Sequence, residues 1–305
     1  MIRHPGESVA MRARNSAKRL HRRAQFLLTM VLATAAFPLV ALEGLLWLGT
    51  ALPGTPLAAL AQWCGAVLFM PRMWLSSIPF VAPPAFLLTW SVARRLVATG
   101  RVERQLSAVT SEWPEPFGAL VNRLGITDRV KLLPVRLVDV RTVGLLRPMI
   151  VCTTGLLETV TPAEFEAILQ HELYHIRCRD PLKVLLGRAV VDGFFWLPVI
   201  RTLLQSFEVA KEQAADAWTV LTVPSEALLS ALVKMLHINH ERSEARTVIA
   251  TAPFTGLAAS RLTFLLEGTV PAPGPTIEWR QVWYTVAVSV TLWGFLFTSC
   301  AAVHP

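Results

Sequence analysis

The segment His171-Glu172-Leu173-Tyr174-His175 contains two histidines four positions apart and a glutamate directly after the first. Residues four apart lie on the same face of an α-helix, so both imidazoles can point at one metal ion. Glu172 lies about 100° around the helix from His171, where its carboxylate reaches a water on the metal without being a ligand. The pattern predicts a site for one zinc ion, with Glu172 as the catalytic base. The alternative is an exposed helix face with two solvated histidines.

A catalytic zinc needs a third protein ligand and one open position. A third histidine at position 181 is excluded because Pro181 stands there. Glu212 is the predicted ligand, and Glu208 is the next candidate. Asp216 and Asp180 are predicted to orient the ligand histidines through hydrogen bonds. Weaker candidates for the third ligand are Asp180, Asp192, Asp216, His237 and His240.

Two helices and two strands must position these residues. Thr161-Pro162-Ala163-Glu164 has the residue types of a helix start, with an N-cap threonine, a proline at the first helical position and a glutamate three residues after the cap. The helix that carries the histidines is therefore predicted to begin there. Residues 208–222 are predicted to form the second helix. Runs rich in Val, Leu and Ile predict strands at residues 130–140 and 149–153.

Residues 143–181 resemble the BlaR/MecR-type membrane zinc peptidases, the antirepressor proteins of β-lactam sensing, and the likeness extends over about 130–268. It is carried by Gly144, Arg147-Pro148, Ile150-Val151, His171 to Ile176, Asp180, Phe195 to Pro198, Glu212 to Asp216 and Arg261-Leu262. The resemblance implies a zinc endopeptidase with an α+β, zincin-like catalytic domain. It also implies that a protein, such as a transcriptional repressor, is the substrate.

The strand around residues 147–153 is predicted to bind substrate by strand addition through Arg147, Ile150 and Val151, although an internal strand is the alternative. The sensing members of the family carry a Ser-x-x-Lys motif. No lysine in this chain has a serine three positions before it. We therefore expect no covalent binding of β-lactams.

The composition predicts a membrane protein. The chain has 305 residues, 53% of them hydrophobic and only 16% charged, whereas about 25% charged residues is usual for soluble domains. The net charge is +8, and many of the basic residues lie before the first apolar run. This distribution is typical of membrane topology and not of a nucleic-acid surface. We therefore predict a mainly helical, multi-pass protein of the cell membrane that contacts the lipid bilayer and does not bind nucleic acid.

These patterns predict a basic cytoplasmic segment, 1–24, followed by a transmembrane region, 25–98, with spans at about 25–51 and 73–93. A metallopeptidase domain, 99–268, faces the cytoplasm. Its apolar run 182–207 joins His175 to Glu212, so it is predicted to be a membrane-associated hairpin and not a full span. A linker, 269–280, and a last transmembrane helix, 281–303, complete the prediction.

Three functions are compatible with these features. The first is a regulatory protease that cleaves a transcriptional repressor. The second is a quality-control metalloprotease of broader specificity. The third is a non-enzymatic signalling protein with a structural zinc site, and Glu172 argues against it, because a structural site needs no base at that position.

Overall fold

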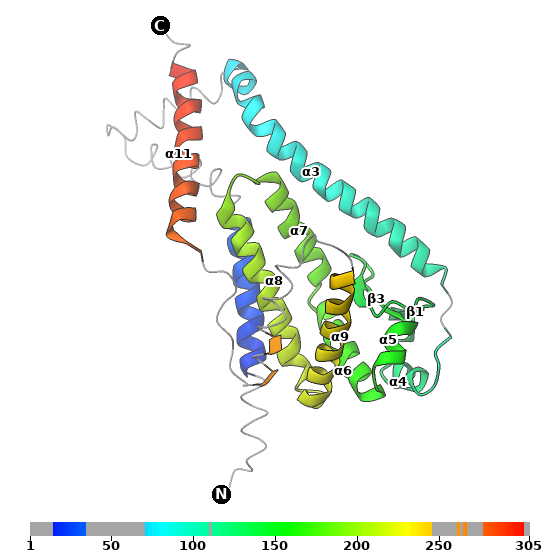
Figure 1. The fold of residues 1–305 in the computed structure, drawn as a ribbon. Helices are drawn as coiled ribbons and strands as arrows, with labels where there is room; N and C mark the ends of the chain where they lie inside the picture. Colours follow the sequence, from blue (N-terminus) through cyan, green and yellow to red (C-terminus); the bar gives the residue numbers. More distant parts are fainter. Residues whose placement is uncertain are drawn as a thin grey trace, which may run out of the picture. The chain divides into compact units, whose positions relative to one another are not determined.

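The computed structural model describes residues 15–34, 71–109, 112–245, 261–262, 265–266 and 277–301. The chain divides into two compact units, and Figure 1 labels their helices and strands. The first unit contains Met1–Phe26, Arg94–Leu185 and Gln205–Gly274, and it holds the predicted metal site. The second unit contains Leu27–Ala93, Leu186–Leu204 and Pro275–Pro305.

The first unit contains a small mixed sheet of three strands, β1 (Val130–Leu133), β2 (Val140–Val143) and β3 (Met149–Thr153). Their order is β1-β3-β2, with β1 parallel and β2 antiparallel to β3. The strand predicted over 130–140 ends earlier, at Leu133, because Pro134 follows and has no N–H for the ladder. The strand predicted over 149–153 is confirmed at both ends.

The helix that carries the histidines, α6 (Pro162–Arg177), begins where the sequence predicts. The Thr161 side chain accepts a hydrogen bond from the Glu164 N–H, and the Glu164 carboxylate accepts one from the Thr161 N–H at 2.7 Å. This reciprocal pair satisfies two N–H groups that a helix start leaves without partners. The sequence therefore fixes where α6 begins, and this sets the direction in which His171 and His175 point.

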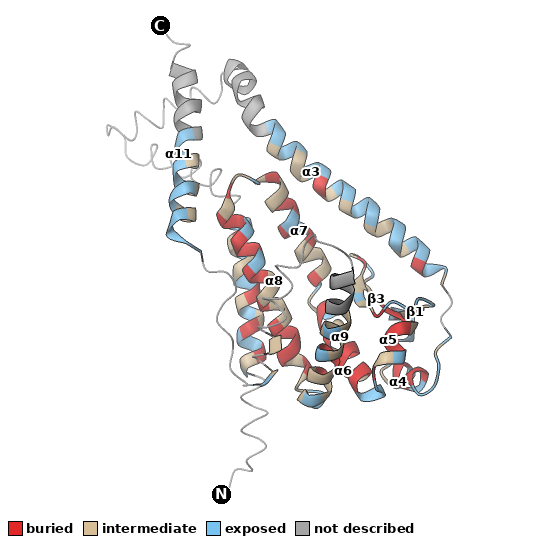
Figure 2. Ribbon diagram, viewed as in Figure 1, coloured by how far each residue is buried: buried red, intermediate tan, exposed pale blue. Residues whose placement is uncertain are grey.

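An apolar core lies between α6, the sheet and the neighbouring helices α4 (Phe117–Arg123), α5 (Thr154–Thr159) and α9 (Ser225–Ala245). Phe165 of α6 is fully buried there and makes an edge-to-face contact with Phe117 of α4, with ring centroids 5.2 Å apart. Short elements such as 3₁₀-helix η1 (Thr127–Arg129) connect α4 to β1. Figure 2 shows the buried residues concentrated on α6 and the elements around it.

The opposite side of α6 packs against an N-terminal helix, residues 15–34, and α8 (Pro198–Thr219). Ala17 and Leu20 of the N-terminal helix share a buried cluster with Tyr174 of α6 and with Ala214 and Ala215 of α8. The two alanines of α8 are completely buried. Their small side chains let three helix backbones approach closely, which brings α8 beside the histidines of α6.

The second unit contains the end of α7 (Asp180–Gly193), the start of α8 and α11 (Trp279–Ala301). Residues 182–207 fall on α7 and α8, and the two helices are separated by a break at 194–197. A Cβ added to Gly187 would lie 2.5 Å from Cδ1 of Leu204, so the two helices pack closely after the break. The run therefore forms a helical hairpin.

The predicted membrane spans are wrong for the described part of the chain, where no helix is both long enough and apolar enough for a bilayer crossing. The predicted span 73–93 falls on α3 (Pro71–Ser107), in which Pro83 and Pro84 interrupt the apolar residues and Arg94 follows them. The fold class is therefore corrected to a mainly helical protein with a small sheet. The same finding contradicts the predicted multi-pass location in the cell membrane as far as the described residues go.

The other two predicted spans are described only in part. Residues 35–51 of the first predicted span, 25–51, lie outside the described residues. The last predicted span, 281–303, falls on α11 as far as Ala301, and the side chains of 292–301 lie outside the description.

Candidate metal centre

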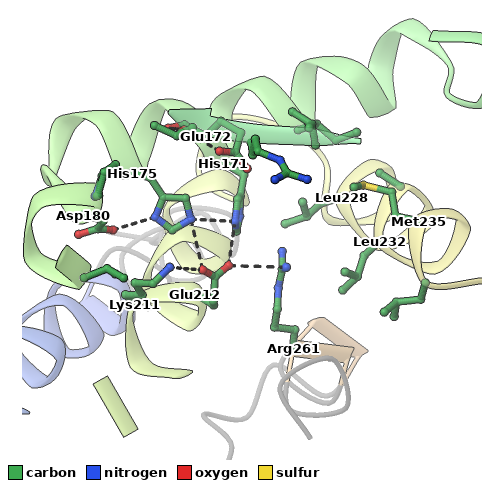
Figure 3. Close-up of a pocket in the computed structure, with 18 residues that line it drawn as sticks. His171, Glu172, His175, Asp180, Lys211, Glu212, Leu228, Leu232, Met235 and Arg261 are labelled. Carbon is green, nitrogen blue, oxygen red and sulfur yellow. Dashed lines mark hydrogen bonds and ion pairs between the residues drawn. The ribbon is translucent and has the colours of Figure 1, made fainter. Parts of the chain in front are cut away.

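Three side chains from two helices converge on one point of the first unit: His171 and His175 of α6 and Glu212 of α8 (Figure 3). The Nε2 atoms of the two histidines lie 3.2 Å apart. Glu212 Oε2 lies 3.2 Å from His171 Nε2, and Glu212 Oε1 lies 3.6 Å from His175 Nε2. Ligand atoms around a tetrahedral zinc ion are roughly 3.3 Å apart, given bonds of about 2.0 Å. The three side chains therefore have the spacing of a tetrahedral site.

The other ring nitrogen of each histidine faces an aspartate. His171 Nδ1 lies 3.0 Å from Asp216 Oδ1, and His175 Nδ1 lies 2.7 Å from Asp180 Oδ2. A carboxylate accepts, so it places the proton of each imidazole on Nδ1. When both imidazoles are neutral, the two Nε2 atoms, 3.2 Å apart, offer their lone pairs to the same point. The donor set therefore fits a metal ion between them.

The carboxylate of Glu172 is held by β2. Thr142 donates a hydrogen bond from its hydroxyl to Glu172 Oε2 at 2.6 Å. Glu172 lines the same pocket as the two histidines, one position along α6 from His171, and does not belong to the convergent group of ligand atoms. It therefore lies beside the metal position without occupying it, as expected for a general base.

Two positively charged side chains, Lys211 and Arg261, border the site (Figure 3). Lys211 Nζ donates to Glu212 Oε1 at 2.5 Å. Arg261 donates to both oxygens of Asp216, from Nε at 2.8 Å and from Nη2 at 2.7 Å, and its Nη1 lies 3.7 Å from Glu212 Oε2. Such a bidentate pair fixes the aspartate that orients His171.

Burial and neighbouring charges shift the pKa values of these groups in opposite directions. Burial by itself would raise the pKa of Glu212, but the charges of Lys211 and His175 hold it well below its usual range. Burial would likewise lower the pKa of His175, but Glu212 and the hydrogen bond to Asp180 raise it to about 9. The Arg261 charge lowers the pKa of Asp216 against the effect of its burial. The carboxylates of Glu212 and Asp216 are therefore ionised.

The site opens into a pocket of about 410 Å³. Its polar lining is formed by the metal-site residues with Asp180, Lys211 and Arg261. Its apolar lining comes mainly from one face of α9, with Ile168 of α6. The α9 residues are Leu228, Ala231, Leu232, Met235 and Leu236.

The structure brings together His171, Glu172, His175, Asp180, Glu212 and Asp216, all of which the sequence places at the site. It does not bring Glu208, Asp192 or His237 there. Glu208 does not line the pocket, and Asp192 lies in the second unit, where it accepts a hydrogen bond from Ser91. His237 is exposed on α9, and the side chain of His240 lies outside the description.

The predicted substrate strand is the central one. Ile150 and Val151 belong to β3, which pairs with β1 on one side and β2 on the other, so a peptide cannot add to it as a further strand. The alternative of an internal strand is therefore the correct one. Arg147 lies in the turn before β3 and outside the pocket lining. β2 borders the pocket instead, through Val140, Arg141 and Thr142.

Sequence reasoning missed Thr142, Lys211 and the apolar face of α9. Thr142 and Lys211 belong to no spacing pattern that would single them out. The α9 face carries the helical spacing 228, 232 and 235, but the same spacing is typical of a core helix. Arg261 entered the sequence analysis only through the family resemblance, and the structure shows that it holds Asp216.

Two histidines on one helix, a glutamate from a second helix and another glutamate beside them form the arrangement of a metal-dependent hydrolase. Residues 80–229 match the family described as BlaR1 peptidase M56. This match supports a place for the chain in that metallopeptidase family and confirms the resemblance seen in the sequence. No curated protein matches the chain. The matched range contains both histidines and Glu212 but ends before Ala231, Leu232, Met235 and Arg261.

Proposed function

We propose that the chain is a zinc endopeptidase that uses His171, His175 and Glu212 as metal ligands. The observation that carries this proposal is the convergence of three side chains: the two Nε2 atoms lie 3.2 Å apart, and the Glu212 carboxylate lies 3.2 Å from one and 3.6 Å from the other, which suits a tetrahedral ion. The outward nitrogen of each histidine faces a carboxylate, as is usual for metal-ligating histidines. Nitrogen and carboxylate ligands in this number are typical of catalytic zinc.

In this proposal each residue has a separate task. Bound zinc supplies Lewis-acid polarisation of the scissile carbonyl and lowers the pKa of water. Glu172 takes a proton from the attacking water and delivers it to the leaving amine. Thr142 orients the Glu172 carboxylate through the hydroxyl hydrogen bond. Asp180 and Asp216 keep the protons of the two imidazoles on Nδ1.

The proposed substrate is a protein, and specifically a transcriptional repressor, whose cleavage would end repression. Support for this substrate class comes from membership of the BlaR1 peptidase family alone. Purified candidate repressors can be incubated with the zinc-loaded protein and examined for cleavage by mass spectrometry. A repressor that is cleaved in wild type and left intact by the Glu172→Gln variant supports the assignment, whereas cleavage of unrelated unfolded proteins at equal rates favours quality control.

The catalytic assignment is tested by Glu172→Gln, which keeps the shape of the side chain but removes the base. We expect the variant to retain its zinc and its melting temperature while peptide hydrolysis falls by about 10²- to 10⁴-fold. Glu166→Gln is the matched control, because Glu166 lies on the same helix, pairs with Arg123 and does not line the pocket. Activity of Glu172→Gln within a few-fold of the control contradicts the assignment.

A further inference from the structure

One side of the pocket is an apolar wall whose residues belong to α9. Leu228, Leu232 and Met235 are spaced by four and three, so they lie on the same face of the helix. All three line the pocket, and Figure 3 shows them across it from Glu212 and the two histidines. We call these three residues the α9 wall.

The α9 wall continues onto α6. Ile168 lies one turn before His171 on α6, lines the same pocket and is buried. Asp180 and Lys211 lie toward the His175 end of the site (Figure 3). The pocket is therefore apolar toward Ile168 and polar toward Asp180, and the metal ligands stand between these two parts.

A charged residue that lines the pocket beside the α9 wall, Arg261, is already engaged. Arg261 points between the wall and Glu212 in Figure 3, and its guanidinium is paired with both oxygens of Asp216. A charged substrate group placed against the wall would lose its hydration and find apolar side chains in return, which is unfavourable. An apolar group would gain from the same burial.

The position of α9 is fixed independently of any ligand. Lys234 lies on this helix between Leu232 and Met235 and pairs with Glu164 of α6 at 2.8 Å. Ser230 donates to the other oxygen of the same carboxylate at 2.5 Å. Since Glu164 also caps α6, the wall and the metal-binding helix are held together by one carboxylate. The wall is therefore preorganised, which favours selective binding.

We propose that the α9 wall is the specificity site of the enzyme and that it accepts one large aliphatic side chain next to the scissile bond. This inference rests on the proposed peptidase function, since it assigns a residue type to the same site. It places specificity on residues that lie mostly beyond the matched range 80–229. Substrates with a leucine-sized residue beside the cleaved bond should be preferred over those with alanine or aspartate.

The test uses short peptide hydroxamates, because the hydroxamate anchors the compound on zinc and leaves one neighbouring side chain to be varied. Three compounds carry an isobutyl, a methyl or a carboxymethyl group at that position. Calorimetry on the zinc-loaded full-length protein gives their Kd values. We expect the isobutyl compound to bind about 10- to 100-fold more tightly than the other two, as for burial of a leucine-sized group.

Two changes at the half-buried Met235 then locate the preference. Met235→Gln keeps the length of the side chain and should remove most of the isobutyl advantage. Met235→Lys should in addition favour the carboxymethyl compound by about tenfold, because an opposite charge then faces it. The control is Val233→Lys, which adds the same charge to an exposed position of α9 outside the pocket lining and should leave the wild-type order unchanged.

The outcomes separate this inference from the proposed function. Equal isobutyl preference in both Met235 variants and in the control overturns the role of the α9 wall, even if the protein hydrolyses peptides. The predicted order of hydroxamates without any peptide hydrolysis leaves the wall in place and contradicts the proposed function. Absence of hydroxamate binding by the zinc-loaded protein overturns both.

Discussion

At the scale of single residues, the two histidines of α6 depend on the carboxylates behind them. Asp216 and Asp180 fix which nitrogen of each imidazole carries the proton, and Asp216 is itself held by Arg261. We expect Asp216→Asn and Asp180→Asn each to weaken zinc binding by about 10- to 100-fold. Competition with a chelating dye measures the change. Asp128→Asn, in η1 and away from the pocket, should bind zinc as wild type does.

The raised pKa of His175 predicts that the free energy of unfolding depends on pH. In protein stripped of metal by a chelator, its pKa is raised to about 9, because Glu212 and Asp180 outweigh the effect of burial. Because the folded protein binds this proton more tightly than the unfolded chain does, protonation of His175 stabilises the fold. This stabilisation is full below the pKa of the unfolded chain, about 6.5, and is lost as the pH rises through 9. The chelated protein should therefore lose free energy of unfolding between pH 6.5 and 9 in urea titrations.

The zinc-loaded protein is the control for this pH dependence. Metal binding requires neutral imidazoles, so the proton of His175 is already displaced and the loss should be smaller. Equal slopes of stability against pH for the two forms would contradict the assigned pKa.

At the scale of elements, the backbone of α5 lies so close to the backbone at Arg136 that a side chain larger than that of glycine is not tolerated at position 155. A Cβ added to Gly155, in α5, would lie 2.3 Å from the Arg136 carbonyl oxygen. Because that atom belongs to the backbone, Gly155→Ala should cost about 1–3 kcal/mol of stability. Gly100→Ala is the matched change, since α3 leaves open space around Gly100. It should stabilise by about 0.5–1 kcal/mol. Equal melting temperatures for the two variants would show that α5 shifts freely.

The sequence predicts local elements better than it predicts their partners. The start of α6 follows from a local capping pattern, and the pairing of His171, His175 and Glu212 follows from ligand chemistry. The apolar run 182–207 was predicted to be a hairpin because it joins His175 to Glu212, but its membrane association was inferred from apolar composition, which does not distinguish burial against protein from contact with lipid. Ile200 and Phe207 are in fact buried within the protein. Contacts such as that of Thr142 with Glu172 depend on tertiary packing, which no local pattern encodes.

At the scale of the whole molecule, the metal site depends on a helix far from it in the sequence and outside the family match, which begins at residue 80. Residues 15–26 of the N-terminal helix belong to the first unit, and Leu20 is buried beside Tyr174, Ala214 and Ala215. His21 of the same helix lies 2.8 Å, through Nδ1, from the Tyr174 hydroxyl. The N-terminal helix therefore supports α6 and α8 from the side opposite the pocket.

This arrangement predicts that damage to the N-terminal helix weakens a metal site to which it contributes no ligand. Leu20→Ala removes a buried side chain and should cost about 2–5 kcal/mol of stability. Because the cavity lies between α6 and α8, which hold the three ligands, zinc affinity should fall together with the melting temperature. Thermal unfolding and zinc competition measure the two effects. Arg19→Ala changes the exposed neighbour and should alter neither. A Leu20→Ala protein that melts earlier but binds zinc with wild-type affinity would show that the N-terminal helix stabilises the fold without holding the ligands in place.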